Sequence, residues 1–444
     1  MISIAHKIEL VPNNKQKTYF HKAFGCYRLA YNWGILEWKR RYEAGEKCSA
    51  ISLNNAFNAI KGEEYPFVYE VTKYACSQAF RNLEEAYKKF FRDLKKGELS
   101  YPKFKKKKDR TGSFYIGGDA TGISEKNKNS KSFKLLHRNS DHKRQYLKVP
   151  RLGCVRMTER LRFEGKIHSV TISLSGSRYY ASFNMEISEE EYKRTHPTKS
   201  IKKGSSVGID MGVSTSLILS DGICVNGPRP LEKALKKIKK ENRQLDKRVH
   251  ARTKQDRLKG VAQSNNYRKL ARKLSKSYKR VSNIRWDFIR KVSSIIIGSY
   301  HNVSVEDMDL KDLLKKSIVS RSMIDVSFGL IKRTLEKKAD KDGVLLKKAD
   351  KLYPSSKTCS RCGAVKKDLT LRDRIFQCEK CGLVLDRDFN ASLNLRKLLE
   401  NEKIGAGCSE FTPVDLTALL FLFKRNGITT SKVESGKQQK ILSS

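Results

Sequence analysis

The spacing of apolar residues changes several times along the first half of the chain. Partial alternation over residues 2–10 predicts a β-strand, and helical spacing predicts helices over 15–41 and 72–95. Both predicted helices carry basic residues on their other faces, and their aromatic residues are interpreted as core packing. Alternation returns within residues 114–183, where Ser175-Gly176-Ser177 predicts the turn of a hairpin. The first half therefore predicts one strand, two long helices and a β-rich stretch, in that order.

A polar segment, 188–206, separates this half from a second half with its own strands and helices. Short apolar strands are predicted at 207–213 and 303–305. Between them, helical spacing over 231–292 breaks near residues 260–266, which predicts a helical hairpin. The polar faces of this hairpin are basic, which favours the wall of a phosphate-lined channel over a coiled coil with a partner helix. The remaining predicted elements are helices over 324–339 and 390–399 and a mostly poorly ordered tail beyond 401.

The charge of the chain narrows its class. Lys and Arg number 93 among 444 residues and Asp and Glu number 47, which gives a net charge of +46. A field of this sign needs an extended polyanion or a strongly anionic membrane as partner, and it excludes an ordinary metabolic enzyme. The longest apolar run, Ala418–Phe423, is far shorter than the roughly 20 residues of a membrane span. Residues 1–8 also lack the apolar core of a secretory signal. We therefore expect an intracellular nucleic-acid-binding protein, cytoplasmic and associated with the nucleoid.

A basic loop at residues 101–108 carries two aromatic residues among its lysines. A lysine run is usually a solvated surface, but in a chain of this charge it favours contact with phosphates. The candidate nucleic-acid contacts in this loop are Lys103, Lys105, Lys106 and Lys107.

Four of the ten cysteines have the spacing of a zinc site. Cys359 and Cys362 form one C-x2-C pair, and Cys378 and Cys381 form a second pair after fifteen intervening residues. Four thiolates close a tetrahedral shell around zinc and leave no position for substrate, so we expect one structural Zn²⁺. The other six cysteines are scattered and are expected to be reduced thiols.

Three acidic residues lie at or near the ends of predicted elements in the second half: Asp210, Glu306 and Asp388. Phosphodiester hydrolysis by in-line attack uses two divalent ions, and carboxylate oxygens suit Mg²⁺. Two neighbouring strands and a facing helix can bring such a set together. Each residue also has a simpler interpretation, because an Asp near a strand end is often a turn residue and Asp388 can cap the helix beginning at Asn390. The spacing by itself leaves both interpretations open.

The order of motifs in the second half resembles that of a known family. The motifs are Gly208-Ile209-Asp210-x-Gly212, Val305-Glu306-Asp307-Met308, and the four-cysteine module running into Asp386-Arg387-Asp388-x-Asn390-Ala391-x-x-Asn394. They resemble the three split RuvC motifs of the TnpB (OrfB) family, RNA-guided DNA endonucleases of insertion sequences that are related to the compact type V CRISPR effectors. The resemblance extends over most of Met1 to about Leu399 through looser matches. These are Tyr31-Asn32-Trp33, Pro102-Lys103-Phe104-Lys105 and Tyr353–Cys359.

The resemblance implies a fold with α/β, β-barrel and helical parts. An RNase H-like (RuvC) nuclease domain would carry an inserted four-cysteine zinc finger, and a β-barrel wedge domain would carry a helical recognition domain. The expected boundaries are 1–14 and 98–203 for the wedge domain, 15–97 for the recognition domain, 204–354 and 385–400 for the nuclease domain, 355–384 for the zinc finger, and 401–444 for a flexible tail.

The resemblance also implies roles for particular residues. Asp210, Glu306 and Asp388 would be the catalytic ligands of two Mg²⁺ ions, with Asp388 rather than Asp386 matching the third acid. Arg374 matches a basic position near the cleaved strand, against the simpler interpretation of a solvent-exposed side chain.

The implied partners are a guide RNA with a structured scaffold and a target double-stranded DNA, cleaved next to a short duplex motif by metal-dependent hydrolysis at a single RuvC site. Two alternatives remain open. One is a transposase that joins DNA strands, and the other is a non-catalytic RNA- or DNA-binding regulator. A transposon nuclease and a compact CRISPR effector share these motifs.

Overall fold

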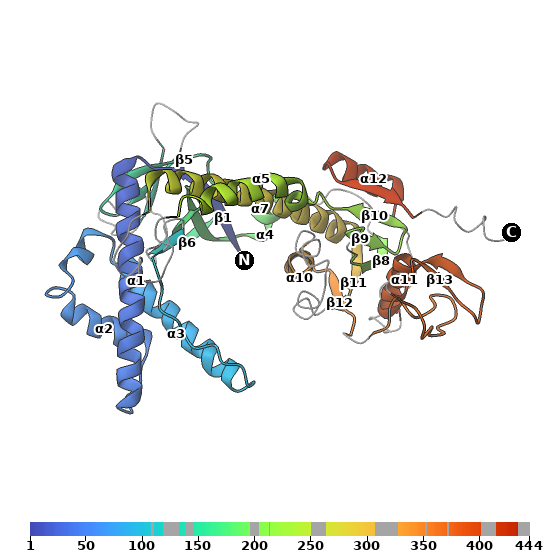
Figure 1. The fold of residues 1–444 in the computed structure, drawn as a ribbon, viewed down its shortest axis with the longest axis horizontal. Helices are drawn as coiled ribbons and strands as arrows, with labels where there is room; N and C mark the ends of the chain where they lie inside the picture. The colour runs from blue at the N-terminus through green and yellow to red at the C-terminus, as the bar shows by residue number, and fades with distance from the viewer. Residues whose placement is uncertain are drawn as a thin grey trace. The chain divides into compact units, whose positions relative to one another are not determined.

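The computed structural model divides the chain into two compact units, the N-terminal unit Met1–Pro197 and the C-terminal unit Thr198–Ser444 (Figure 1). It describes residues 1–107, 111–118, 133–137, 145–195, 204–212, 214–249, 263–306, 327–350, 353–370, 373–400 and 414–433. Within these ranges, no helix has an apolar stretch long enough to span a bilayer.

The N-terminal unit is built on one antiparallel seven-stranded sheet. Strand β1 lies inside it, paired with β7 on one side and with β5 on the other. Alternate residues of β1, including Ile4, Ile8 and Leu10, are buried on one face, as the two-residue period requires. The strands are β1 (Ile2–Val11), β2 (Thr111–Gly117), β3 (Lys134–His137), β4 (Gln145–Val149), β5 (Gly153–Met157), β6 (Lys166–Ser175) and β7 (Arg178–Ile187), in the order β2-β6-β7-β1-β5-β4-β3. The predicted hairpin is the β6–β7 pair, in which Ser175 faces Arg178.

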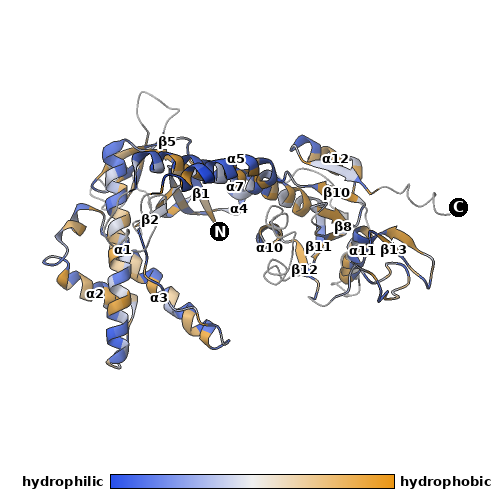
Figure 2. Ribbon diagram, in the orientation of Figure 1, coloured by the Kyte–Doolittle hydropathy of each residue, from blue (hydrophilic) through white to orange (hydrophobic). Residues whose placement is uncertain are grey.

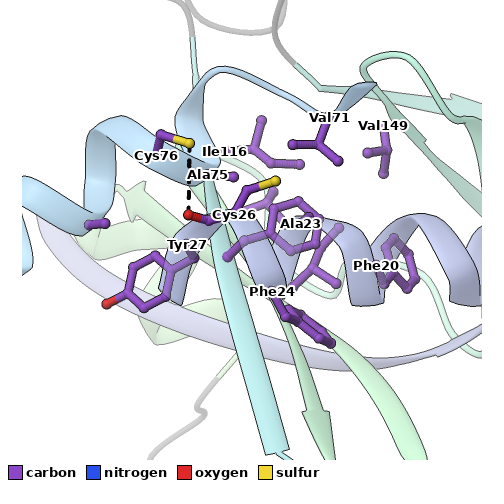
Figure 3. Close-up of a cluster of buried hydrophobic side chains, with 14 of the residues drawn as sticks. Phe20, Ala23, Phe24, Cys26, Tyr27, Val71, Ala75, Cys76, Ile116 and Val149 are labelled. Atoms are coloured by element: carbon purple, nitrogen blue, oxygen red, sulfur yellow. Dashed lines mark hydrogen bonds between the residues drawn. The ribbon is translucent and has the colours of Figure 1, made fainter. Parts of the chain in front are cut away.

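A helical insertion follows β1 along the chain. It consists of α1 (Asn14–Glu43), α2 (Ala50–Ile60), the 3-10 helix η1 (Pro66–Glu70) and α3 (Tyr74–Leu94), and the short helix α4 (Glu189–Thr195) follows β7. Asn13 caps α1 by accepting the N–H of Gln16, whose side chain accepts the N–H of Asn13 in return. The buried face of α1, including Phe20 and Phe24, packs on the sheet beside Ile116 and Val149 (Figure 3). One core therefore joins the sheet and the helices of this unit.

The C-terminal unit contains a mixed six-stranded sheet in the order β12-β11-β8-β9-β10-β15. Strands β12, β11 and β8 are parallel to one another, and β9, β10 and β15 continue the sheet in antiparallel pairs. The strands are β8 (Gly204–Asp210), β9 (Leu217–Leu219), β10 (Ile223–Asn226), β11 (Tyr300–Val305), β12 (Leu345–Lys348) and β15 (Thr429–Lys432), and the helices that accompany them are α10 (Phe328–Asp342), α11 (Arg387–Glu400) and α12 (Leu416–Arg425). The sequence-based expectation of mixed α/β sheets is confirmed at this level.

Two long helices, α5 (Pro230–Asp246) and α7 (Asn265–Ser299), form the predicted helical region between the strands. They pack together through a narrow apolar seam that includes Ile238 and Leu245 of α5 and Leu274 of α7. Outside this seam, α5 is largely hydrophilic (Figure 2), whereas Ile289, Val292 and Ile296 in the second half of α7 belong to the core of the C-terminal unit. Of the predicted break near residues 260–266, residues 260–262 lie outside the described residues, and α7 begins at Asn265 with Ser264 as its cap.

The expectation of a flexible tail beyond 401 is wrong for residues 414–433. Helix α12 buries Leu419, Leu422 and Phe423 in the core of the C-terminal unit, and Asp415 caps it by accepting the N–H groups of Thr417 and Ala418. Strand β15 then pairs with β10 along the sheet edge. The apolar run that is too short for a membrane span is long enough to anchor a helix on a sheet. Residues 401–413 and 434–444 lie outside the described residues.

Candidate active site

Two of the predicted acids lie at the same end of two neighbouring parallel strands. Val305 of β11 is paired with Ile209 of β8. Asp210 is the last residue of β8, and Glu306 is the residue that follows β11. Because parallel strands in register end at the same sheet edge, the two carboxyl groups are brought to one place by the sheet itself.

Helix α11 lies against β8 and β11 because both strands present small residues to it. A Cβ atom on Gly208 would lie 2.1 Å from the carbonyl oxygen of Ser392 and 2.4 Å from the backbone nitrogen of Arg396. On β11, the Ser304 hydroxyl donates to the carbonyl oxygen of Leu395 at 2.6 Å. This close approach brings the first turn of α11, which carries Asp388, to the sheet edge.

Asp386 and Asp388 have different partners. Asp386 Oδ1 accepts the backbone N–H groups of Asp388 at 3.0 Å and Phe389 at 2.9 Å, so Asp386 caps α11. The cap that the sequence allowed for Asp388 is thus made by Asp386. The carboxylate of Asp388 instead interacts electrostatically with Asp210 and Glu306.

The three carboxyl groups form an electrostatically strained cluster. Asp210 is only 8% exposed, and burial, together with the nearby Asp388 and Glu306, raises its pKa well above the usual value. Burial and Asp388 also raise the pKa of Glu306. Carboxylates that repel one another in a low-dielectric site take up protons unless cations neutralise them. The oxygen-only donor set and the charge of this cluster fit hard divalent cations such as Mg²⁺.

Two arginines already contact Asp388. Arg387 donates from Nε and Nη2 to Asp388 Oδ1, both at 3.1 Å, and its side chain is only 13% exposed. Arg374 Nη1 lies 3.8 Å from Asp388 Oδ2, and its side chain is 62% exposed. Arg374 therefore lies at the acidic cluster while leaving most of its guanidinium group open to solvent. Sequence reasoning gave Arg387 no role, although an arginine between two aspartates is a detectable signal of local pairing.

The four predicted cysteines come together in a separate small core. Their Sγ atoms all lie within 4.8 Å of one another, with 3.5 Å between Cys359 and Cys381 and 3.5 Å between Cys362 and Cys378. A tetrahedral site with Zn–S bonds of about 2.3 Å has sulfur atoms about 3.8 Å apart, so the cluster fits one zinc ion. Such a set can hold a metal, as the sequence predicted.

The same tight turn is used at both cysteine pairs. Gly363 donates its N–H to the carbonyl oxygen of Cys359, and Gly382 donates to that of Cys378. Both glycines have positive φ angles, 75° and 67°, which favour glycine over other residues. The second pair belongs to a hairpin of β13 (Ile375–Gln377) and β14 (Val384–Asp386), which runs directly into α11.

Two buried asparagines join this cysteine module to α11. Asn390 Nδ2 donates to the carbonyl oxygen of Thr358 at 2.7 Å, and Asn390 Oδ1 accepts the N–H of Ser360 at 2.9 Å. Asn394, one turn later, donates to the carbonyl oxygens of Ser355 and Thr358 at 2.8 and 2.6 Å. The motif asparagines therefore fix the loop before Cys359 to the helix that carries Asp388. Sequence reasoning quoted both residues but assigned them no function.

The four candidate lysines lie in the N-terminal unit and differ in their surroundings. Lys103, Lys106 and Lys107 are exposed. Lys105 turns back onto α1, where Nζ lies 4.5 Å from the ring centre of Tyr27 and 4.1 Å from that of Tyr31. Lys105 is thus tied to the protein itself, and any role of the four lysines in nucleic-acid binding stays a prediction.

Comparison with known proteins adds three family matches. Residues 183–317 match the OrfB family of IS605-type elements, described as a probable transposase; residues 328–395 match a Cas12f1-like TNB domain; and residues 1–47 match a helix-turn-helix domain of the OrfB family. The last description does not fit the structure, because residues 1–47 form a strand and one continuous 30-residue helix.

Individual relatives extend over most of the chain. A candidate RNA-guided DNA endonuclease of Streptomyces pristinaespiralis is 28% identical over 396 residues, covering 88% of each protein. The candidate RNA-guided DNA endonuclease InsQ of Escherichia coli K12 is 26% identical over 411 residues, covering 88% of this chain and 91% of InsQ. Among solved structures, a complex of Cas12f1 with guide RNA and target DNA aligns with 84% of this chain and 81% of that one, at 16% identity and a TM-score of 0.49.

These matches make the chain similar to proteins of insertion sequences. Within that class it is similar to the TnpB (OrfB) family, with a further match to a domain of the Cas12f1 type.

Proposed function

We propose that this protein is an RNA-guided DNA endonuclease of an insertion sequence. The proposal rests above all on one feature, the meeting of Asp210, Glu306 and Asp388 from two parallel strands and a helix at one sheet edge. The relatives named as candidate RNA-guided DNA endonucleases align over 88% of this chain, which supports the same activity here. The net charge of +46 suits a protein that holds RNA and DNA together.

In the proposed mechanism, Asp210, Glu306 and Asp388 would hold two Mg²⁺ ions. When bound, the ions supply the Lewis acidity that activates water and stabilises the leaving oxygen of the scissile phosphodiester. Arg387 fixes the carboxylate of Asp388 by its two hydrogen bonds. Arg374 presents a solvent-open guanidinium group at the same edge, where it can bind a phosphate of the strand to be cut.

The finer description of the fold is part of the same proposal. The six-stranded sheet with α11 would be the RNase H-like (RuvC) nuclease domain, interrupted by a zinc-binding module at 355–384. The seven-stranded sheet would be the wedge domain, with α1, α2 and α3 as the recognition domain. The cysteine cluster would hold one structural Zn²⁺, whose loss would loosen the hydrogen bonds of Asn390 and Asn394 to its first loop.

The proposed partners are a guide RNA with a structured scaffold and a double-stranded target DNA. Base pairing between guide and target would supply the sequence specificity, and the protein would read a short duplex motif beside the target. The protein–nucleic-acid contacts would then go mainly to phosphates, which would account for the excess of basic residues.

The test is a cleavage assay on protein purified with RNA transcribed from its native flanking DNA. We expect a discrete RNA to copurify and a matching DNA target to be cut in Mg²⁺. Asp210→Ala should lower the cleavage rate roughly hundredfold or more while RNA and target binding remain. The matched control is Asp287→Ala, which removes an exposed carboxylate paired with Lys291 on α7.

Other outcomes identify the alternatives. Strand-transfer products from the purified protein would indicate a transposase. Heterogeneous RNA that high salt removes, with no cleavage by the wild type, would leave a non-catalytic binding protein.

A further inference from the structure

A cavity of about 700 Å³ lies in the N-terminal unit. Its walls come from α1, from the basic loop before β2, and from the adjoining ends of β2 and β6. This volume is within the usual range for sites that hold small molecules or single groups of larger ligands. The lining residues are Lys7, Phe24, Tyr27, Arg28, Phe104, Lys105, Lys106, Thr111, Gly112, Ser113, Ser173, Leu174 and Ser175.

Aromatic rings from two different segments line the cavity. Phe24 and Tyr27 come from successive turns of α1, which Figure 3 shows beside each other, and Phe104 comes from the basic loop. Gly112 lets β2 lie directly on Phe24, because a Cβ there would lie 2.6 Å from the ring. Phe104 is 51% exposed, so its ring is available to a planar group from outside.

The basic loop is held in place rather than loosely exposed. Asn32 of α1 accepts the N–H of Lys105 at 2.8 Å and donates to the carbonyl oxygen of Lys105 at 3.0 Å. Lys105 Nζ also donates to the hydroxyl of Tyr27 at 2.8 Å. The neighbours of Lys105, Phe104 and Lys106, are therefore positioned at the cavity before any ligand arrives, which lowers the entropy cost of binding.

The cavity is suited to an anion. Arg28 and Lys106 have no carboxylate partner among the described residues, and Arg28 is half-buried. None of the described residues that line the cavity is acidic. A half-buried guanidinium group without a counter-charge gains most from a ligand that brings a negative charge, and a phosphate matches its donor geometry.

Hydroxyl groups cluster on the adjoining strand ends. Thr111 is paired with Ser175 and Ser113 with Ser173 across β2 and β6. Directly paired residues project from the same face of a sheet, so the four hydroxyl groups share one face, opposite to the face on which Gly112 meets Phe24. They therefore do not face the rings of α1.

We propose that this cavity holds one unstacked ribonucleotide of the bound RNA. Its base stacks on Phe104, and its phosphate lies between Arg28 and Lys106. Aromatic stacking beside basic side chains is the usual way in which proteins hold unpaired nucleotides. The inference rests on the proposed function only in requiring that the protein bind RNA.

The test compares Phe104→Ala with Phe67→Ala in the full chain. The two rings are equally exposed, at 51% and 50%, but Phe67 does not line the cavity. The copurifying RNA of the wild type is the probe, titrated at fixed salt, and a DNA strand of the same sequence is the second probe. Phe104→Ala should weaken RNA binding by about five- to a hundredfold, the range for loss of one stacked base, and Phe67→Ala should leave it unchanged. Lys106→Ala should weaken RNA binding and lower its dependence on salt.

Photo-crosslinking of the wild-type complex gives a second readout, and we expect a crosslink from Phe104 to a single nucleotide. RNA affinity unchanged in Phe104→Ala, with cleavage intact, would overturn the inference and leave the proposed function standing. A loss of target DNA binding alone would overturn it in favour of a DNA site. A wild type that binds no discrete RNA would overturn the proposed function first, and this inference with it.

Discussion

Asp386 accepts two backbone N–H groups at the start of α11, whereas Asp388, two positions later, interacts electrostatically with Asp210 and Glu306. The difference follows from where the helix begins. A cap residue must turn its oxygen back to the first free N–H groups, while a residue in the first turn projects sideways from the helix axis. The start of α11 thus uses the carboxylate of Asp386 to cap the helix and the carboxylate of Asp388 for the candidate site.

This division of roles predicts opposite effects for two substitutions. Asp386→Ala should lower the free energy of unfolding by about 1 kcal/mol, the usual cost of losing a cap, and leave most of the cleavage activity. Asp388→Ala should abolish cleavage and leave stability near that of the wild type. Thermal unfolding and cleavage rates of both variants check this. If Asp386→Ala loses cleavage and Asp388→Ala keeps it, Asp386 is the residue of the site and Asp388 is not.

The raised pKa of Asp210 predicts a pH dependence of stability. In the metal-free protein, folded Asp210 keeps its proton to higher pH than it does in the unfolded chain. Its contribution to stability is therefore complete below the usual carboxyl pKa of about 4 and is lost as the pH rises through the raised value. Asn at this position stays neutral. The melting temperature of Asp210→Asn should therefore exceed that of the wild type by a margin that grows as the pH rises from about 4 towards neutrality.

Melting curves across this pH range in EDTA measure the effect, with Asp287→Asn as an exposed control. Adding Mg²⁺ should raise the melting temperature of the wild type more than that of Asp210→Asn, because cations neutralise the same charge. If the difference in melting temperature between the wild type and Asp210→Asn does not change with pH, the pKa of Asp210 is not raised in solution.

At the scale of elements, Gly208 decides how closely α11 approaches β8. A Cβ at this position meets backbone atoms of Ser392 and Arg396, which no side-chain rotation relieves. Gly208→Ala should therefore displace α11, cost about 1–3 kcal/mol of stability and lower cleavage by moving Asp388. Gly298→Ala on α7 is the matched control, because nothing lies within 4 Å of its added Cβ. Equal unfolding free energies for the two variants would contradict the packing argument.

The elements that sequence reasoning predicted are those with long periodic patterns. Helices α1 and α3 and the β6–β7 hairpin follow directly from the spacing of buried residues. Helix α2 was missed, although Ala50, Leu53 and Phe57 are buried at helical spacing, because it has only 11 residues. Helix α12 was missed because its apolar run was judged by membrane length instead of by its capacity to cover a sheet.

The candidate site residues that could be predicted from the sequence are those whose residue type and spacing suggest a chemical role. Residues whose roles depend only on three-dimensional contacts could not be predicted. Acids after strands and paired cysteines have recognisable spacing. Arg387, Asn390 and Asn394 acquire their roles only when α11 lies beside the cysteine loop and the sheet. In the same way, Lys105 cannot be separated from its lysine neighbours until the rings of α1 are placed under it.

At the scale of the whole molecule, each unit has its own hydrophobic core, so damage to one need not unfold the other. The proposed RNA pocket lies in the N-terminal unit and the acids and cysteines in the C-terminal unit. Removing the metal of the cysteine cluster should therefore separate RNA binding from cleavage. The hydrogen bonds of Asn390 and Asn394 provide the route by which its loss reaches Asp388.

Cys359→Ser tests this, with Cys154→Ser as the control because Cys154 is an exposed free cysteine of the other unit. We expect Cys359→Ser to copurify with less than one zinc per chain, to lose cleavage and to unfold at a lower temperature, because a structural zinc site contributes folding free energy. RNA binding should fall far less than cleavage, since the N-terminal core is untouched. Zinc content, RNA affinity and cleavage rate are measured on the same preparations. Cleavage at the wild-type rate by a zinc-free variant would show that α11 holds Asp388 in place without the cysteine module.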